Sequence, residues 1–105
     1  MAKREQIMAS HFKILIHQSS DTLHLKLEGD FDGTSAYELI NTIKKYSNRF
    51  ARVFIHTSGV KQVFDFGRNV FQNSFPAKGD RSAKFIFTGQ AGRQLAPEGC
   101  RLAYL

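Results

Sequence analysis

Two short apolar runs constrain the fold of this chain more than any other feature of its sequence. Val53–Ile55 and Phe85–Phe87 are each three consecutive apolar residues bounded by polar ones. Runs of this kind are typical of a strand covered on both faces, and also of an inner strand of a parallel sheet. An amphipathic segment precedes each run. The chain therefore predicts strand–helix–strand units, in which the crossovers are right-handed and the strands are parallel.

The first part of the chain predicts two antiparallel strands. Residues 11–18 alternate between apolar and polar side chains, with Leu15 as the exception, and residues 22–28 alternate strictly. A period of two is typical of strands that bury one face. The link at residues 19–21 is short and polar, which favours a β-hairpin. Because the hairpin adds an antiparallel strand to the parallel ones, the sheet is expected to be mixed.

Two amphipathic segments predict helices. In the first, from about Ser35 to Ser47, apolar residues recur at helical spacing and basic residues gather at the end. Ser35 and Glu38 have the spacing of a capping box, in which each side chain bonds the other residue's backbone N–H. The second segment, residues 68–75, ends at Pro76, which cannot continue a helix.

The predicted order of elements is β-β-α-β-α-β, which is an α/β fold with a mixed sheet of four to five strands and helices mainly on one face. Residues 91–95 predict a further helical turn, and residues 101–105 predict a final strand. Residues 11–105 are expected to form one domain, since a chain of 105 residues supports a single core. Residues 1–10 are expected to form an N-terminal tail.

Composition excludes several classes of protein. The single cysteine, Cys100, cannot form an internal disulfide, which indicates a reducing compartment and favours the cytoplasm. No apolar run approaches the roughly 20 residues of a membrane-spanning helix, so no membrane partner is expected. The four histidines lack the close spacing of a zinc site, so neither a metal nor a cofactor is expected. The formal net charge of +6 predicts an acidic partner face.

Two short motifs resemble those of a known family. Residues 27–32 read Leu-Glu-Gly-Asp-Phe-Asp, and residues 53–60 read Val-Phe-Ile-His-Thr-Ser-Gly-Val, with Gly67 soon after. Together with the order of elements between Phe12 and Gln90, they resemble the STAS domain of bacterial anti-sigma factor antagonists. The resemblance implies signal transduction and transcription regulation through a protein partner, which in the family is an anti-sigma factor and serine kinase. It also places Asp32 at the family's acidic position.

The chain departs from the family at the phosphorylation motif. The family commonly has Asp-Ser-Ser-Gly before the second helix, and the serine beside the glycine accepts phosphate. Here residues 64–67 read Phe-Asp-Phe-Gly, so Phe66 stands at that position and carries no hydroxyl. We therefore expect no phosphoswitch at this residue. A central loop is expected between the strand at residues 52–57 and the helix at residues 68–75. Its hydroxyls at Ser58 and Thr57 could accept phosphate instead, although a role in the turn is favoured for both.

Three roles are open for Phe66. It shares a predicted helix face with Val70, which favours packing in the core. An exposed anchor for a partner and a residue lining a ligand pocket are the alternatives. Asp65, just before it, is expected to be the N-cap of the second helix.

No constellation of residues indicates catalysis, so a non-enzymatic protein-interaction domain is expected. Its predicted partner-binding residues are Asp32, Ser58, Asp65, Phe66, Arg68, Asn69 and Gln72. The alternative is a nucleotide- or anion-binding module in which the start of the second helix and Arg68 hold the anion, together with Gly89–Gly92. Nucleic acid ranks last, because the phenylalanines are expected to be buried. A second copy of the chain is a further candidate partner, at an open sheet edge.

Overall fold

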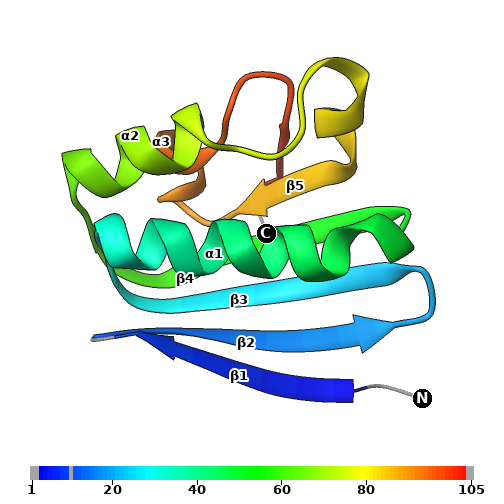
Figure 1. The fold of residues 1–105 in the computed structure, drawn as a ribbon, viewed down its shortest axis with the longest axis horizontal. Coiled ribbons are helices and arrows are strands. Elements are labelled where there is room, and N and C mark those ends of the chain that lie inside the picture. The colour runs from blue at the N-terminus through cyan, green and yellow to red at the C-terminus, as the bar shows by residue number, and fades with distance from the viewer. Residues whose placement is uncertain (1–2, 10, 104–105) are drawn as a thin grey trace.

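A computed structural model describes residues 3–9 and 11–103 and shows one sheet with helices against it (Figure 1). The elements in chain order are β1 (Lys3–Ala9), β2 (Phe12–Ser19), β3 (Thr22–Phe31), α1 (Gly33–Tyr46), the 3₁₀ segment η1 (Ser47–Arg49), β4 (Arg52–Val63), α2 (Asp65–Asn73), the 3₁₀ segment η2 (Gly79–Lys84), β5 (Phe85–Thr88), α3 (Gly92–Leu95) and β6 (Arg101–Ala103). The strands form one sheet in the order β1-β2-β3-β4-β5-β6. β1 to β3 are antiparallel neighbours and β3 to β6 are parallel, so the predicted mixed α/β fold is confirmed.

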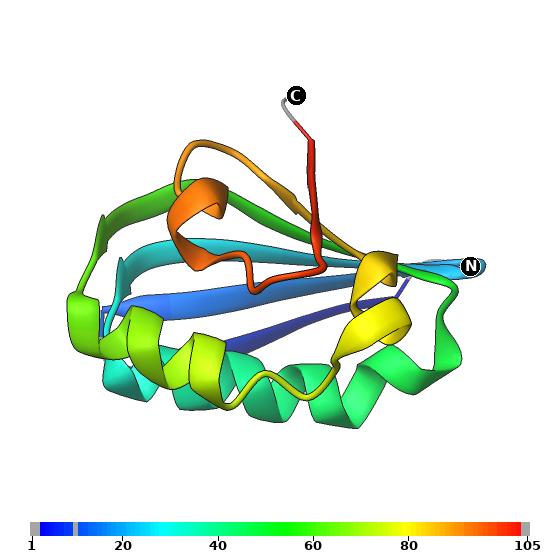
Figure 2. The same ribbon diagram turned by 90° about the horizontal axis from the view of Figure 1, so that it is seen from above.

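The two main helices, α1 and α2, lie side by side on the same face of the sheet (Figures 1 and 2). The alternation in β3 explains which face they cover. Leu23, Leu25 and Leu27 are fully buried, whereas His24 is half-buried and Lys26 is exposed on the opposite face. Apolar side chains therefore bind the helices to one side of the sheet, and polar ones occupy the other side.

β4 is an inner strand with parallel neighbours on both sides, which is one of the two predicted alternatives, and helices cover only one of its faces. Val53 and Ile55 of β4 are fully buried, while Phe54 between them is half-buried on the opposite face. There the ring of Phe54 lies parallel to the rings of His24 and His56, with centroids 5.1 and 5.8 Å away. These two rings shield Phe54 from water in place of a helix.

The sheet has six strands because residues 3–9 join it. This segment, predicted to be a tail, pairs with β2 from Lys3↔Gln18 to Ala9↔Phe12. The strand forms because its backbone pairs with the free donors and acceptors along the edge of β2. This backbone pairing does not require apolar and polar side chains to alternate in residues 3–9. Residues 1, 2 and 10 of the predicted tail, and residues 104 and 105 of the predicted last strand, lie outside the described residues.

Strand β4 is longer than its apolar run, so most of the predicted central loop is strand. Its pairing with β3 continues through Gly29↔Val60 to Phe31↔Val63, with two shifts of register on the way. The parallel ladder pairs Gly59, Val60, Gln62 and Val63 with β3, so this segment is strand rather than turn. Phe64 alone separates β4 from α2.

Phenylalanine rings hold α2 against the sheet. Phe71 on α2 packs edge to face with Phe31 and Phe87, with ring centroids 5.8 and 6.1 Å away. Phe75 packs in the same way against Phe85, at 4.9 Å. All of these rings are buried, and such edge-to-face pairs add to the free energy gained from burial alone.

Candidate functional site

At one end of the sheet, β3 and β4 lead into the first turns of α1 and α2 (left in Figure 1). The backbone N–H of Phe64 donates to the carbonyl oxygen of Phe31 at 2.9 Å. Gly67 then brings α2 against the same chain segment, because a Cβ atom at this position would lie 2.6 Å from the carbonyl carbon and oxygen of Asp32. This close approach requires glycine, and it places the two helix starts side by side.

Asp32 caps α1. Its Oδ1 accepts the backbone N–H of Ser35 at 2.9 Å, and the Ser35 hydroxyl lies 2.9 Å from the same oxygen and 2.8 Å from the carbonyl oxygen of Asp30. The Ser35 backbone hydrogen bond lowers the pKa of the Asp32 carboxyl. The predicted capping box of Ser35 and Glu38 is wrong, because a charged carboxylate is the stronger acceptor and starts the helix at Gly33.

Three exposed aromatic side chains surround the two helix starts. Phe66 is 68% exposed, Tyr37 56% and Phe64 45%, so the prediction that Phe66 packs in the core is wrong. The ring of Phe66 lies over Gly33, where a Cβ atom would come within 2.8 Å of two ring carbons. Tyr37 is one helical turn beyond Gly33 on the same face of α1. We refer to Tyr37, Phe64 and Phe66 as the aromatic surface.

Polar residues of α2 lie beside the aromatic surface. The predicted N-cap Asp65 is instead the first helical residue, and the N-cap is Phe64, which makes no side-chain capping bond. Because only one residue separates β4 from α2, the helix has no room for a polar cap. Asp65 pairs with Arg68 at 3.6 Å, and Asn69 is exposed on the next turn. The pair is largely exposed, so it contributes little to stability and remains available to a partner.

The other predicted site residues lie elsewhere. The Gln72 amide donates to the carbonyl oxygen of Gln94 at 3.0 Å and so ties α2 to α3. The hydroxyl of Thr57 is buried and donates to the carbonyl oxygen of Thr88 at 2.6 Å, so it is not accessible to a kinase. Ser58 is exposed, but it borders a different hollow, between the middle of β4 and the loop that follows β5.

This hollow contains part of the predicted anion site, since Gly89, Gln90 and Ala91 line it but no residue of α2 does. It has a volume of 350 Å³ and includes Ser58, Gly89 and Gln90 in its lining. Gly89 has a φ of +89°, and a Cβ atom there would lie 2.6 Å from the Thr57 hydroxyl oxygen, so the tight turn requires glycine. The helix that follows, α3, has only four residues and cannot offer a developed N-terminal dipole.

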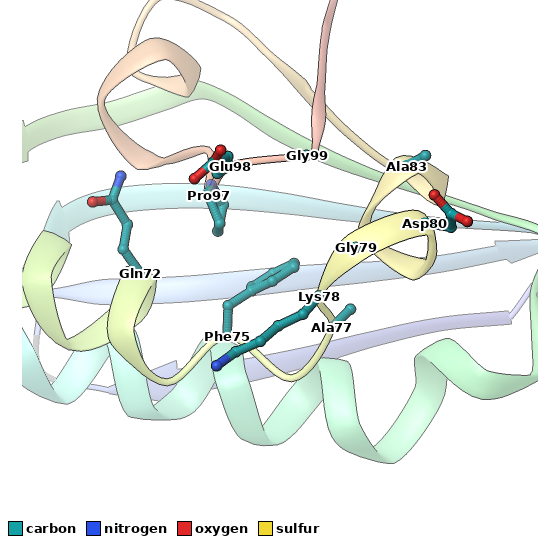
Figure 3. Close-up of a pocket in the computed structure, with 10 residues that line it drawn as sticks. All are labelled: Gln72, Phe75, Ala77, Lys78, Gly79, Asp80, Ala83, Pro97, Glu98 and Gly99. Atoms are coloured by element: carbon teal, nitrogen blue, oxygen red, sulfur yellow. The ribbon is translucent and has the colours of Figure 1, made fainter.

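A further cavity of 590 Å³ lies between the end of α2 and the loops on either side of β5 (Figure 3). Phe75 lies in its middle. Lys78, Asp80 and Glu98 border it, but their charged ends point in different directions rather than toward one point (Figure 3). Acid–base or nucleophilic chemistry needs groups that converge on a reacting atom, so this arrangement offers none.

On the face of the sheet opposite the helices, two histidines form a hydrogen-bonded pair that was not predicted from the sequence. His24 Nδ1 lies 3.0 Å from His56 Nε2, and His56 Nδ1 lies 2.8 Å from the Thr88 hydroxyl oxygen. Burial lowers the pKa of both histidines. His17 and His24 are paired across the β2–β3 hairpin, and their ring centroids are 6.0 Å apart. In the described part of the chain, no group of three or more His, Cys, Asp or Glu side chains could hold a metal ion.

Comparison with known proteins identifies the fold. No protein-family model matches the chain, and no curated protein matches it. Among solved structures, it is similar to the anti-sigma factor antagonist SpoIIAA in its unphosphorylated form, with a TM-score of 0.55 and 10% identity over 96% of this chain and 87% of that chain. The chain has a STAS-like fold. At this identity the similarity concerns the fold alone.

Within the STAS-like fold, the aromatic surface occupies the junction where the sequence resemblance places a phosphoacceptor serine. Cys100 is half-buried, and burial raises the pKa of its thiol to about 12, so it stays protonated and unreactive. No helix among the described residues is long and apolar enough to cross a membrane.

Proposed function

We propose that this chain is a non-enzymatic regulatory domain that binds a signalling protein, in the manner of an anti-sigma factor antagonist, and that the aromatic surface is the centre of its interface. The observation that carries the proposal is the exposure of Tyr37, Phe64 and Phe66 around two helix starts. Exposed aromatic groups of this size are costly in water, and they are typical of interface hot spots. The fold supports a regulatory role through its similarity to SpoIIAA.

Polar residues complete the proposed interface. Asp65, Arg68 and Asn69 border the aromatic surface on α2, and Asp32 lies behind it at the start of α1. Charge at this end is nearly balanced, since Asp32 and Asp65 offset Lys61 and Arg68. An apolar centre with a mixed polar rim therefore describes the surface better than a basic patch. We expect the complex to weaken only slightly as salt rises, contrary to what the net charge alone suggests.

The same geometry argues against regulation by phosphate at this junction. Phe66 has no hydroxyl, and the hydroxyl of Thr57 is buried in a hydrogen bond. Ser58 is the exposed hydroxyl that remains on this part of β4. We propose that the domain binds its partner without a phosphoswitch at the family position, so that its activity follows its abundance or a second input.

The test is capture of a partner from the native host, followed by calorimetry with purified proteins. Phe66→Ala should lower affinity at least tenfold, because removal of an interface hot spot costs about 2 kcal/mol or more. Leu102→Ala is the matched control, since Leu102 is 45% exposed but lies on β6. Unchanged affinity in Phe66→Ala, with circular dichroism showing a folded protein, would refute the proposed interface.

A nucleotide- or anion-binding module is the second candidate function, supported by the hollow beside Ser58 and Gly89. Thermal-shift measurements with GTP and ATP address it directly. Stabilisation that Gln90→Glu abolishes would favour this candidate, because the new carboxylate would repel an anion in the hollow. Stabilisation that the substitution leaves unchanged would argue against it.

A further inference from the structure

Basic side chains are concentrated at the end of the molecule opposite the aromatic surface. Here the end of α1 meets η1, η2, the start of β4 and the β2–β3 turn (right in Figure 1). These segments carry Lys44, Lys45, Arg49, Arg52, Arg81 and Lys84, against Asp21 and Asp80. Six basic minus two acidic side chains leave an excess of four, out of +6 for the whole chain. Most of the net charge is therefore at one end.

A groove of 680 Å³ opens within this basic end, between the end of α1 and η2. Lys44, Asn48 and Arg81 lie on its rim and offer hydrogen-bond donors. Pro76 and Ala77 form an apolar wall, while Phe85 in the same lining is buried in the core. The groove thus combines cationic donors with an apolar surface, and its volume is within the range of small-molecule sites.

The rim cations are not neutralised by the protein. The ion pairs among the described residues join Lys13 and Lys26 to Glu28, Arg52 to Asp21, and Arg68 to Asp65. None of these pairs includes Lys44 or Arg81. Asp80, the one carboxylate of the lining, is also outside them. Two free cations around one groove attract an anion.

Lys84 offsets the electrostatic repulsion that an anion would otherwise meet at this end of α1. The carbonyl oxygens at a helix C-terminus carry partial negative charge, which would repel an anion. The Lys84 ammonium donates to the carbonyl oxygens of Ser47 and Phe50, at 2.7 and 3.2 Å. It therefore neutralises the end of α1 and η1 and holds η2 beside them. Lys84 is a positioning residue, and Lys44 and Arg81 are left to contact the ligand.

We propose that this basic groove binds a small ligand that carries phosphate groups beside an apolar part. Guanidinium and ammonium groups form charge-assisted hydrogen bonds with phosphate oxygens, and the wall of Pro76 and Ala77 accepts the apolar part. The groove lies at the opposite end from the aromatic surface. The proposal is therefore independent of the proposed protein partner, and a bound ligand would leave that surface free.

The experiment is isothermal titration of ATP and of inorganic tripolyphosphate into the full chain, with backbone amide NMR to locate binding. ATP should bind more tightly than tripolyphosphate, because its adenine can contact the wall. Arg81→Glu should weaken ATP binding at least about tenfold, since a charge-assisted contact is lost and a like charge is added. Amide signals of Lys44, Asn48 and Arg81 should shift on titration.

Lys45→Glu is the matched control, because Lys45 neighbours Lys44 on α1 but lies outside the groove lining. It makes the same change in net charge and should weaken binding less than about threefold. Equal losses in Lys45→Glu and Arg81→Glu would show diffuse attraction to the basic end and overturn the groove. Absence of heat and of amide shifts at millimolar ATP, or shifts gathered at Gly89–Ala91, would also overturn it. Equal affinity for ATP and tripolyphosphate would refute the proposed contact between the apolar part of the ligand and the wall of the groove.

Discussion

Gly67→Ala tests the close packing of α2 against Asp32, which places the two helix starts side by side. A Cβ atom at this position would lie 2.6 Å from the carbonyl carbon and oxygen of Asp32 and 2.8 Å from the carbonyl oxygen of Phe31. These are backbone atoms and cannot rotate away, so α2 must shift outward. Overpacking of this kind costs up to about 3 kcal/mol, while alanine returns roughly 1 kcal/mol of helix propensity. We expect a net loss of about 2 kcal/mol in the free energy of unfolding.

Urea unfolding followed by circular dichroism measures this loss, and the melting temperature should fall by roughly 8–16 °C. Asn69→Ala is the control, since it adds the same residue to α2 at an exposed position. It should be neutral or slightly stabilising, because alanine is the better helix former. A Gly67→Ala protein as stable as the natural chain would show that the approach of α2 to Asp32 is not tight, and the account of the junction would fail.

Two further predictions concern protons and caps. Asp32→Ala should lower the free energy of unfolding by about 1 kcal/mol at neutral pH, measured by urea unfolding. Because the folded state lowers the Asp32 pKa, this difference should shrink as pH falls through about 4, where the unfolded carboxyl takes up a proton. The folded state also lowers the pKa of His24 and His56, so the unfolded state binds more protons below about pH 6.5. Melting temperature should therefore fall on acidification from pH 7 to pH 5.5, and His24→Gln with His56→Gln should flatten that slope.

The sequence predicts the strands and helices whose side chains alternate with a clear period. β2 and β3 alternate because one face packs against helices, and this pattern is visible without a structure. β1 is different. Residues 3–6 are a run of polar residues, Lys-Arg-Glu-Gln, and the strand forms because the edge of β2 offers backbone partners. Such a strand depends on its neighbour, so no pattern in its own residues predicts it.

For Phe66, the structure differs from the sequence prediction in the direction of the side chain. Phe66 and Val70 are large apolar residues four positions apart, so the helical periodicity predicts that they form the buried face of α2. In the structure the buried residues of α2 are Gly67 and Phe71, one position further on. Glycine faces the core because it lets the helix approach Asp32, and this turns Phe66 outward. A search for large apolar residues cannot detect a core position that glycine occupies, because glycine has no side chain.

The histidine pair was missed for a related reason. His24 and His56 are separated by 32 residues, and only the parallel register of β3 and β4 brings their rings together. Alternation places each of them on the open face, but it does not specify which residues become neighbours across strands. Register depends on how α1 and its connections span the sheet, which single-residue patterns do not encode.

The order of the strands has a consequence for how the protein is made. Each strand pairs with the strand that precedes it in the chain, so no strand has to be inserted between two that are already paired. A chain that emerges from the ribosome with its N-terminus first can therefore extend the sheet one edge at a time. The β2–β3 hairpin can form as soon as Phe31 has emerged, and β4 and β5 follow with their helices. Synthesis and assembly can thus proceed in the same direction, which shortens the time that unpaired strand edges remain exposed.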